Sequence, residues 1–398
     1  SDLKIIILCV LLFIAVSASL DTPGGKNQCT NWDNHGGSIY NRRFASNEKR
    51  ISPFTASTLS LKWKFDAGLY VTVTPAIHDE ILYFPSANGS VYAVEASSGS
   101  LVWKIFLSDI TDFPPIGEFL KLNVTIAKST PTVAGDLLII GIYSPAVVIA
   151  VDRFNGKLIW STRLDYHPNS LITQSGTYYK GNYFVGVSSL EEVYAKENCC
   201  TFRGSFCKLD ARNGAVLWQT FMLPDNHGET KLYAGAAVWG SSPSIDVRRN
   251  HVYIATGNLY SVPPSVKACQ ISLNSQTTPT KPDACLGPDI HSESILALDM
   301  DSGAIKWNRQ IGGYDVWTLS CSAPNNTCLS SGPNVDADFG EAPMMLTLKT
   351  NGRKIDAVVA AQKSGFVWAL NRDNGELLWF TVRGLFEGDQ RNEAMAVL

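Results

Sequence analysis

The fold of this protein follows from a phrase that reads Ala150-Val151-Asp152-Arg153-Phe154-Asn155-Gly156 and ends at Trp160. Four more copies run through the chain with few changes, at residues 93–103, 208–218, 297–307 and 369–379. The apolar residue and the Asp close a strand, Asn-Gly supplies the positive φ of a hairpin turn, and the next strand delivers Trp four residues after the Gly. Five copies are far beyond chance and indicate an internal repeat.

A second signature precedes several copies of the phrase. Thr130-Pro131-Thr132-Val133 is followed by the apolar run Leu137-Leu138-Ile139-Ile140, and similar pairs begin at Thr74 and at Ser242. These runs predict the two inner strands of a sheet. The five Trp residues lie 57, 58, 89 and 72 positions apart, and a base period near 57 is typical of propeller blades.

Each such sheet alone would leave an apolar face in water, so we expect neighbouring sheets to stack. Trp is a large flat side chain that suits the space between them. The sequence therefore predicts one all-β propeller over residues 21–398, with five Trp side chains buried at equivalent places: Trp103, Trp160, Trp218, Trp307 and Trp379.

The composition of the 398 residues agrees with a globular all-β protein. Hydrophobic residues make up 45% and charged residues 17%, and the 10 Trp, 14 Tyr, 17 Phe and 31 Gly suit many short aromatic strands joined by tight turns. The formal net charge of -3 provides no basic surface for a phosphate backbone or an anionic membrane. Nucleic acid is therefore not an expected partner.

The first twenty residues have the pattern of a signal peptide. Lys4 precedes the apolar run 5–16, and the small residues Ser17-Ala18-Ser19 offer a cleavage point. The alternative is a membrane anchor, but the run is shorter than the roughly 20 residues that a spanning helix needs. We expect a secreted protein with no membrane span after signal removal, and, because Ser1 stands where Met is usual, residues missing upstream.

Removal of Cys9 with the signal would leave eight cysteines, an even set that can pair fully. Spacing makes Cys269–Cys285 and Cys321–Cys328 plausible disulfides, and the adjacent Cys199 and Cys200 a candidate vicinal one; the alternative pairs these two with Cys207 or Cys29. Zinc is not favoured, because no paired C-x-x-C appears. Sequons at Asn88, Asn123 and Asn325 suit a glycoprotein.

The Trp-containing phrase resembles the repeats of the pyrroloquinoline quinone (PQQ) dehydrogenase family, whose propellers have eight blades. The resemblance covers roughly residues 30–390. The wording is most similar to polyvinyl alcohol dehydrogenase-like proteins, including plant members, at residues 199–205 and 32–37. Five phrases do not complete eight blades, so the resemblance implies a propeller of the eight-bladed type that is incomplete at the C-terminus of this chain.

The resemblance also implies a cofactor site for PQQ and calcium. In the family a Trp forms the floor beneath the quinone ring and a later Asn at the end of a strand coordinates calcium, and Trp239 and Asn258 match that pair. Glu192 matches the family's carboxylate calcium ligand better than Glu191 does. The alternatives are ordinary packing for Trp239, a turn residue for Asn258 and a solvated loop carboxylate for Glu192.

Two further features complete the implied cofactor site. Lys363 matches a basic residue that contacts the quinone oxygens in the family, where a cation stabilises the reduced, anionic form. A disulfide between Cys199 and Cys200 is similar to the vicinal disulfide that caps the quinone in related dehydrogenases, although its sequence context differs.

The catalytic base is the point at which the match fails. Many quinoprotein alcohol dehydrogenases carry an Asp after the Trp of a D-x-W-D string, whereas this chain has Asp315-Val316-Trp317-Thr318. A Thr hydroxyl cannot serve, so the base is Asp315, another carboxylate such as Asp336 or Asp338, or absent. We choose Asp315; the alternative is a carboxylate that only orients a backbone turn.

These features predict a quinone-dependent alcohol dehydrogenase that oxidises secondary or polymeric alcohols and passes electrons to an acceptor protein. The alternative is a non-catalytic propeller that serves as a binding platform without cofactor. A hydrolase has little support, because no G-x-S-x-G string appears. If the dehydrogenase interpretation holds, five residues far apart in the chain should converge at one end of the propeller axis: Glu192, Trp239, Asn258, Asp315 and Lys363.

Overall fold

The chain divides into a segment Ser1–Thr30 and a unit Asn31–Leu398. The computed structural model describes residues 31–111, 124–193, 199–273, 281–322, 336–350 and 352–382. The expected signal peptide, Cys29, and the sequons at Asn123 and Asn325 lie outside these residues. Across the described residues, no helix has both the length and the apolar character needed to cross a membrane.

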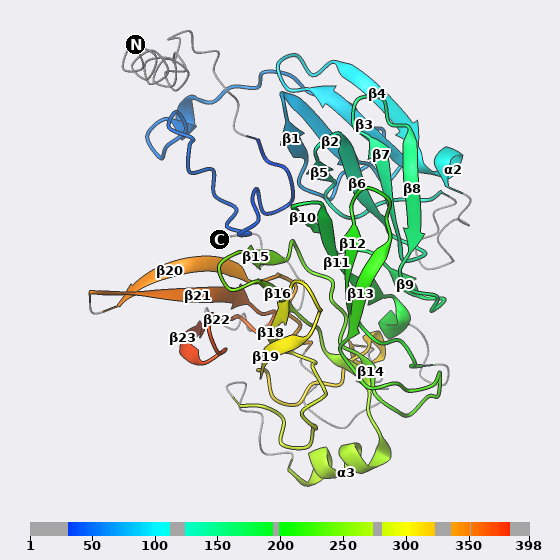
Figure 1. Cartoon of the computed structure of the whole chain (residues 1–398), viewed down its shortest axis with the longest axis vertical. Helices are drawn as coiled ribbons and strands as arrows, with labels where there is room; N and C mark the ends of the chain where they lie inside the picture. Colours follow the sequence, from blue (N-terminus) through cyan, green and yellow to red (C-terminus); the bar gives the residue numbers. More distant parts are fainter. Residues whose placement is uncertain are drawn as a thin grey trace, which may run out of the picture. The chain divides into compact units, whose positions relative to one another are not determined.

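Five antiparallel sheets, each with four strands in chain order, make up most of the described unit (Figure 1). The first two sheets are β1 (Ala76–His78), β2 (Ile81–Pro85), β3 (Ser90–Glu95) and β4 (Leu101–Phe106), and β5 (Thr132–Ala134), β6 (Leu137–Ile142), β7 (Val147–Asp152) and β8 (Leu158–Arg163). The third is β10 (Thr177–Tyr179), β11 (Asn182–Ser189), β12 (Ser205–Asp210) and β13 (Val216–Phe221), with β9 (Ser170–Leu171) paired to β11. The fourth is β15 (Ser244–Asp246), β16 (His251–Ala255), β18 (Ser294–Asp299) and β19 (Ile305–Gln310), and the fifth is β20 (Met344–Thr350), β21 (Arg353–Ala361), β22 (Phe366–Asn371) and β23 (Leu377–Val382).

The remaining elements are short and lie in the connections. A two-stranded sheet pairs β14 (Ala234–Gly235) with β17 (Leu259–Ser261). The helices are α2 (Leu107–Ile110) and α3 (Pro264–Ser272), with 3-10 turns η1 (Ala56–Thr58), η2 (Glu191–Val193) and η4 (Leu319–Ser322). The prediction of an all-β fold is confirmed.

Each copy of the repeated phrase forms the third strand, the turn and the fourth strand of its sheet. The turn Gly has positive φ in all five copies, between 71° and 75°. A register shift occurs at the same place in every third strand, for example between Ala150 and Val151. The carboxylate of Asp152 accepts the backbone N–H groups of Phe154 and Asn155, which fixes the turn. The repeat is therefore a structural unit, as predicted.

The Trp of one sheet docks on the turn of the next sheet. Trp103 donates its indole N–H to the carbonyl oxygen of Arg153 at 2.9 Å, and Trp160 donates to Ala211 at 2.9 Å. Trp218 and Trp307 repeat the contact in the two following sheets. Trp63 makes the same bond to Ala96 at 2.9 Å and lies against Gly99, so the contact includes a Trp that the five phrases do not predict.

The burial of the five Trp side chains follows from these contacts, with one correction. Trp103, Trp160 and Trp307 are buried and Trp218 is half-buried, but Trp379 is 40% exposed. The prediction of equivalent burial is wrong for Trp379, because no turn among the described residues covers its ring as the turn of the next sheet covers the others.

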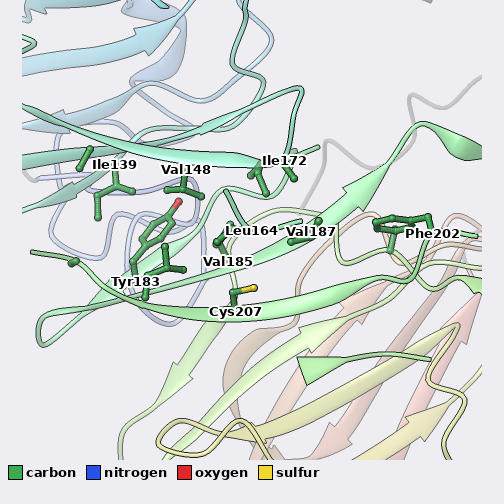
Figure 2. Packing of buried hydrophobic residues seen from close by; sticks show 14 of the residues in the cluster. Ile139, Val148, Leu164, Ile172, Tyr183, Val185, Val187, Phe202 and Cys207 are labelled. Atoms are coloured by element: carbon green, nitrogen blue, oxygen red, sulfur yellow. The ribbon is translucent and has the colours of Figure 1, made fainter. Parts of the chain in front are cut away.

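The core lies between neighbouring sheets, as the apolar faces of the strands require. Tyr183 and Val185 of β11 and Cys207 of β12 pack in one cluster with Ile139 of β6 and Val148 of β7 (Figure 2). All of these side chains are fully buried. Stacking of sheet on sheet therefore removes the apolar faces from water.

The cysteine predictions have mixed outcomes. Cys269 and Cys285 form a disulfide, as predicted. It joins α3 to a later part of the same connection between β16 and β18. Cys199 and Cys200 are bonded to each other. The alternative pairing of these two cysteines with Cys207 is wrong, because Cys207 is a free thiol buried in the core between two sheets. Cys321 is disulfide-bonded, but its predicted partner Cys328 lies outside the described residues.

Asn88, the sequon asparagine that lies among the described residues, has its side-chain amide engaged in hydrogen bonds. The Asn88 amide nitrogen donates to the carbonyl oxygen of Ala67 at 2.9 Å and to the hydroxyl of Tyr92 at 2.8 Å. Its amide oxygen accepts the backbone N–H of Ser90. Asn88 therefore serves as a turn residue in this structure.

Candidate functional site

The predicted site residues all lie in connections at one end of the sheets. Glu192, Asn258 and Lys363 follow the second strands β11, β16 and β21, whereas Trp239 and Asp315 follow the fourth strands β13 and β19. In a four-stranded antiparallel sheet the second and fourth strands run in the same direction, so the loops that follow them lie at the same end. The topology thus brings together residues that are far apart in the chain.

Lys363 lies at the centre of this group. Its ammonium Nζ is 2.6 Å from Oδ1 of Asp336 and 3.0 Å from Oδ2 of Asp338. It also lies 5.3 Å from the centroid of the Trp239 ring, within range of a cation–π contact. The two carboxylates hold the pKa of Lys363 above its usual value against the effect of burial, so the side chain is a permanent cation.

Asn258 is fixed by three bonds and keeps one atom without a partner. Its backbone N–H donates to Oδ1 of Asp338 at 2.6 Å, and its amide nitrogen donates to the carbonyl oxygens of Leu259 and Trp317 at 2.7 and 2.8 Å. The side-chain oxygen Oδ1 is buried and has no hydrogen-bond partner. Buried polar atoms without partners are rare and destabilising, so this oxygen is available to a ligand.

Glycine at position 257 is what allows Asp338 and Trp239 to approach Asn258. A Cβ at Gly257 would lie 2.5 Å from Oδ1 of Asp338 and 3.3 Å from Nε1 of Trp239. Any larger residue here would displace the carboxylate from the Asn258 backbone.

Glu192 lies on η2 and faces the same carboxylates. Burial and then the charge of Asp338 raise the pKa of Glu192 to about 8, while Lys363 and a hydrogen bond from Tyr260 act in the opposite direction. The neighbouring Glu191 is buried and accepts the backbone N–H groups of Thr201 and Phe202 at 2.7 to 2.9 Å. Glu191 is therefore occupied in holding the cysteine loop, which leaves Glu192 for the site.

Asp315 is buried and serves the backbone of the connection between β19 and β20. Its Oδ2 accepts the backbone N–H of Ala337 at 2.6 Å, and the carboxylate also accepts the N–H of Asp336. Its Oδ1 has no partner. Burial first, and then the charges of Asp338 and Asp336, raise the pKa of Asp315 to about 7 against these backbone bonds.

Cys199 and Cys200 belong to the apolar cluster against which Trp239 packs. Both are buried, together with Phe202 and Tyr260. The disulfide and the indole ring are thus held by the same cluster, although Cys199 and Cys200 lie after β11 and Trp239 lies after β14.

Sequence reasoning missed Glu293 and Gln362. Gln362 donates its amide to Oε2 of Glu293 at 3.0 Å, while Oε1 of Glu293 is buried without a partner. Burial, and then the charges of Asp315 and Asp338, raise the pKa of Glu293 well above its usual range. The only signal was an acidic residue immediately before the apolar strand 294–299, which fits no motif.

Thr318 follows Trp317, whose carbonyl oxygen accepts the Asn258 amide. It is buried, and its hydroxyl lies 2.8 Å from that of Ser320. The η4 turn that follows it lies against η2, which carries Glu192. Thr318 therefore lies close to the residues of the candidate site.

The residues present fit a hard cation and a flat anionic ligand. The donors are carboxylate and amide oxygens, which Ca²⁺ prefers, and Asn258 Oδ1 lacks a partner that a cation would supply. Within the described ranges, no three His, Cys, Asp or Glu side chains form a complete cage. A cation here would therefore take its remaining ligands from the Asn258 amide and from a bound molecule.

Comparison with known proteins identifies the class. Residues 285–386 match the model of the glucose/ethanol/alcohol dehydrogenase β-propeller domain. Residues 27–186 and 120–309 match the PQQ-repeat model described as outer membrane protein assembly factor BamB. Together with the repeated four-stranded sheets, these matches show that the chain belongs to the PQQ β-propeller family.

The more particular similarity is to alcohol dehydrogenases. Polyvinylalcohol dehydrogenase from Pseudomonas sp is 28% identical over 364 residues, which cover 87% of this chain and 50% of that protein. The enzyme of the same description from Sphingopyxis sp. (strain 113P3) is 26% identical, over 91% of this chain and 52% of its own length. The chain spans about half the length of these relatives.

A solved structure shows the same fold. Quinohemoprotein alcohol dehydrogenase from Comamonas testosteroni superposes with a TM-score of 0.65 at 20% identity, covering 89% of this chain and 49% of that one. The predicted fold class is confirmed by this similarity together with the family matches.

Proposed function

We propose that this protein is a secreted, quinone-dependent alcohol dehydrogenase that binds PQQ and calcium and oxidises secondary or polymeric alcohols. The observation that carries the proposal is the convergence of Glu192, Trp239, Asn258 and Lys363 on the Asp336–Asp338 pair. Five separate loops contribute to one polar cluster beside an aromatic ring, which is an arrangement that suits a flat, charged ligand.

Each residue has a role that its surroundings support. The Trp239 ring is the flat apolar surface on which the quinone lies, and the Cys199–Cys200 pair is the cover held by the same cluster. Glu192 and the unpartnered oxygen of Asn258 hold calcium. Lys363, a fixed cation over Trp239, stabilises negative charge on the quinone oxygens.

When bound, the quinone supplies the carbonyl that accepts a hydride equivalent from the alcohol carbon. The chain then has to orient the alcohol and accept its hydroxyl proton. The carboxylates of the β19–β20 connection are available to accept this proton, and Asp315 is the one predicted from the sequence. An acceptor protein takes the electrons afterwards.

The test is a titration of the folded protein with PQQ and CaCl₂, followed by the quinone absorbance and by quenching of Trp fluorescence. Saturable binding that needs calcium and is lost with chelator is the expected result. Binding without turnover on any secondary alcohol or polyvinyl alcohol would remove the catalytic part of the proposal. The second candidate is a non-catalytic binding platform without cofactor, which Thr318 in place of the usual Asp favours and which a lack of quinone binding would support. Absence of quinone binding would refute the dehydrogenase proposal.

A further inference from the structure

Only one carboxylate of the β19–β20 connection is placed to meet a substrate. Asp315 and Asp338 are each 4% exposed, and the nearby Glu293 is 1% exposed. By side chain alone, Asp336 is 20% exposed and Asp338 is 6% exposed. A group that takes a proton from an alcohol has to come within hydrogen-bond distance of it, so accessibility separates Asp336 from the other three.

Asp315 already has a different task. Its carboxylate accepts the N–H groups of two consecutive residues, Asp336 and Ala337. Asp336 has φ of 57°, a left-handed conformation that costs free energy in a residue other than Gly and persists only where the surroundings hold it. The Asp315 carboxylate is the contact that holds this turn, which is the role that the sequence left open as its alternative.

The turn places Asp336 against the cation of the site. Asp336 Oδ1 lies 2.6 Å from Lys363 Nζ, and Lys363 in turn lies over the Trp239 ring. The backbone N–H of Lys363 donates to the carbonyl oxygen of Asp338 at 3.0 Å, so the two loops are also joined through their main chains. A ligand stacked on Trp239 would therefore have Asp336 at its edge.

We propose, on the basis of the function proposed above, that Asp336 is the catalytic base and that Asp315 is a positioning residue that fixes the turn bearing it. In the step, the O–H bond of the alcohol breaks and its proton goes to the Asp336 carboxylate. The hydrogen on the alcohol carbon would leave with the electron pair of its C–H bond as hydride, which a bound quinone would accept. The alcohol would become the carbonyl product, and transfer of the proton from Asp336 to the reduced cofactor would restore the carboxylate.

The charge environment of Asp336 suits this role. The charged groups that interact with Asp336 are Lys363, Asp338, Glu192, Asp315 and Glu293. Burial, and then the charge of Asp338, raise the pKa of Asp336 to about 6, while Lys363 lowers it. The carboxylate is thus ionised above about pH 6 and ready to accept a proton.

The experiment compares Asp336→Asn with the matched variant Asp315→Asn in the full chain. Two quantities are measured for each: the Kd for PQQ with saturating CaCl₂, by absorbance, and the single-turnover rate of quinone reduction by a secondary alcohol between pH 5 and 9. Asp336→Asn should bind PQQ within about threefold of wild type but reduce the quinone at least roughly 100-fold more slowly, without the fall in rate below about pH 6.

Asp315→Asn keeps an oxygen that accepts a backbone N–H, so it should keep the wild-type pH profile while its rate falls by less than that of Asp336→Asn, whereas Asp315→Ala should weaken both binding and rate. The proposal is overturned if Asp315→Asn abolishes turnover while Asp336→Asn does not. It is also overturned if Asp336→Asn loses PQQ binding in parallel with turnover, because Asp336 would then act only by holding Lys363. Failure of the wild-type protein to bind PQQ refutes the proposed function itself. This outcome is distinct from failure of the Asp336 proposal, because it is measured without any variant.

Discussion

Asn258 is the residue at which backbone geometry and the proposed chemistry depend on each other most directly. Three of its polar groups are bonded to the protein and the fourth, Oδ1, points to no partner. An amide that anchors two carbonyls and presents one oxygen is a rigid ligand, because it does not have to be ordered when a cation binds.

We predict that Asn258→Ala weakens calcium-dependent PQQ binding by at least about tenfold, since one of two protein ligands is lost. Isothermal titration with PQQ at fixed CaCl₂ measures the change. The exposed turn residue Asn213 offers a matched control, and Asn213→Ala should leave the Kd unchanged. Equal affinity in Asn258→Ala and wild type would remove Asn258 from the metal site.

The buried acids of the site also predict how stability depends on pH. The pKa values of Asp315 and Asp336 are raised to about 7 and about 6, chiefly by burial, whereas an unfolded Asp titrates near 3.9. Between about pH 4 and pH 7 the folded apoprotein therefore binds protons that the unfolded chain has released. The free energy of unfolding should fall across this window as the pH rises, by an amount on the order of a few kcal/mol.

Urea denaturation of the chelator-treated protein at pH 5 and pH 7.5 measures this effect. Asp315→Asn removes one of the titrating groups but keeps an acceptor for the Ala337 N–H, so its stability should depend less on pH. Exposed acids such as Asp210, with a pKa lowered to about 2, titrate below this window and do not obscure it. His35, whose pKa burial lowers to about 4, acts in the opposite direction in both proteins, so the quantity compared is the difference between wild type and Asp315→Asn. The same pH dependence of stability in the two proteins would contradict the assignment of Asp315 as a buried acid with a raised pKa.

At the scale of the element, the turn of the repeated phrase connects sequence to packing. The Gly of each copy has positive φ and also receives a Trp ring, which comes from the preceding sheet except at Gly99, where it is Trp63. Gly214 has φ of 74°, and a Cβ there would lie 2.4 Å from Oγ1 of Thr162 and 2.5 Å from Cε3 of Trp160. Gly181, in the turn between β10 and β11, has φ of 82° but nothing within 4 Å of such a Cβ.

This pair separates backbone strain from steric contact. Gly181→Ala should cost about 1 kcal/mol from the unfavourable left-handed conformation alone. Gly214→Ala should cost roughly 1 to 3 kcal/mol more, because Trp160 has to move from a packed interface. Denaturant midpoints followed by Trp fluorescence measure both, and equal losses would show that the Trp ring does not depend on this close approach.

At the scale of the whole molecule, the fold could be predicted from the sequence and the site only in part. The phrase repeats because each sheet needs the same turn and the same Trp contact, so five sheets were visible as five copies. Trp63 was missed because it stands without the Asp-x-x-Asn-Gly part of the phrase, although it makes the same bond to the next turn. The exposure of Trp379 could not be predicted from its own copy of the phrase, since burial of a Trp ring depends on its contact with the turn of another sheet.

The convergence of the site residues could be predicted from the topology, but the role of each acidic residue within the site could not. Every candidate lies in a loop after a second or fourth strand, and these loops share one end of the sheets. Which acid meets the substrate depends on exposure and on bonds such as that from Ala337 to Asp315, and neither leaves a pattern in the sequence. The role of Glu293 could not be predicted for the same reason, because its closeness to Asp315 arises only from packing.

The last prediction concerns which part of the molecule responds to a ligand. Glu192 comes from the sheet of β10–β13, Asn258 from that of β15–β19 and Lys363 from that of β20–β23, whereas the sheet of β1–β4 contributes none of the proposed site residues. When a ligand bridges these three loops, local opening of any of the three sheets breaks contacts with the ligand. Opening of these sheets should therefore become rarer by mass action. Hydrogen–deuterium exchange with and without PQQ and CaCl₂ should therefore show slower exchange at residues 190–193, 256–260 and 362–365, the loops that carry Glu192, Asn258 and Lys363. Exchange in residues 76–106 should be unchanged, and this sheet is the internal control. Slower exchange confined to β1–β4, or spread evenly over all five sheets, would mean that the ligand binds elsewhere and that the convergence of these loops has another purpose.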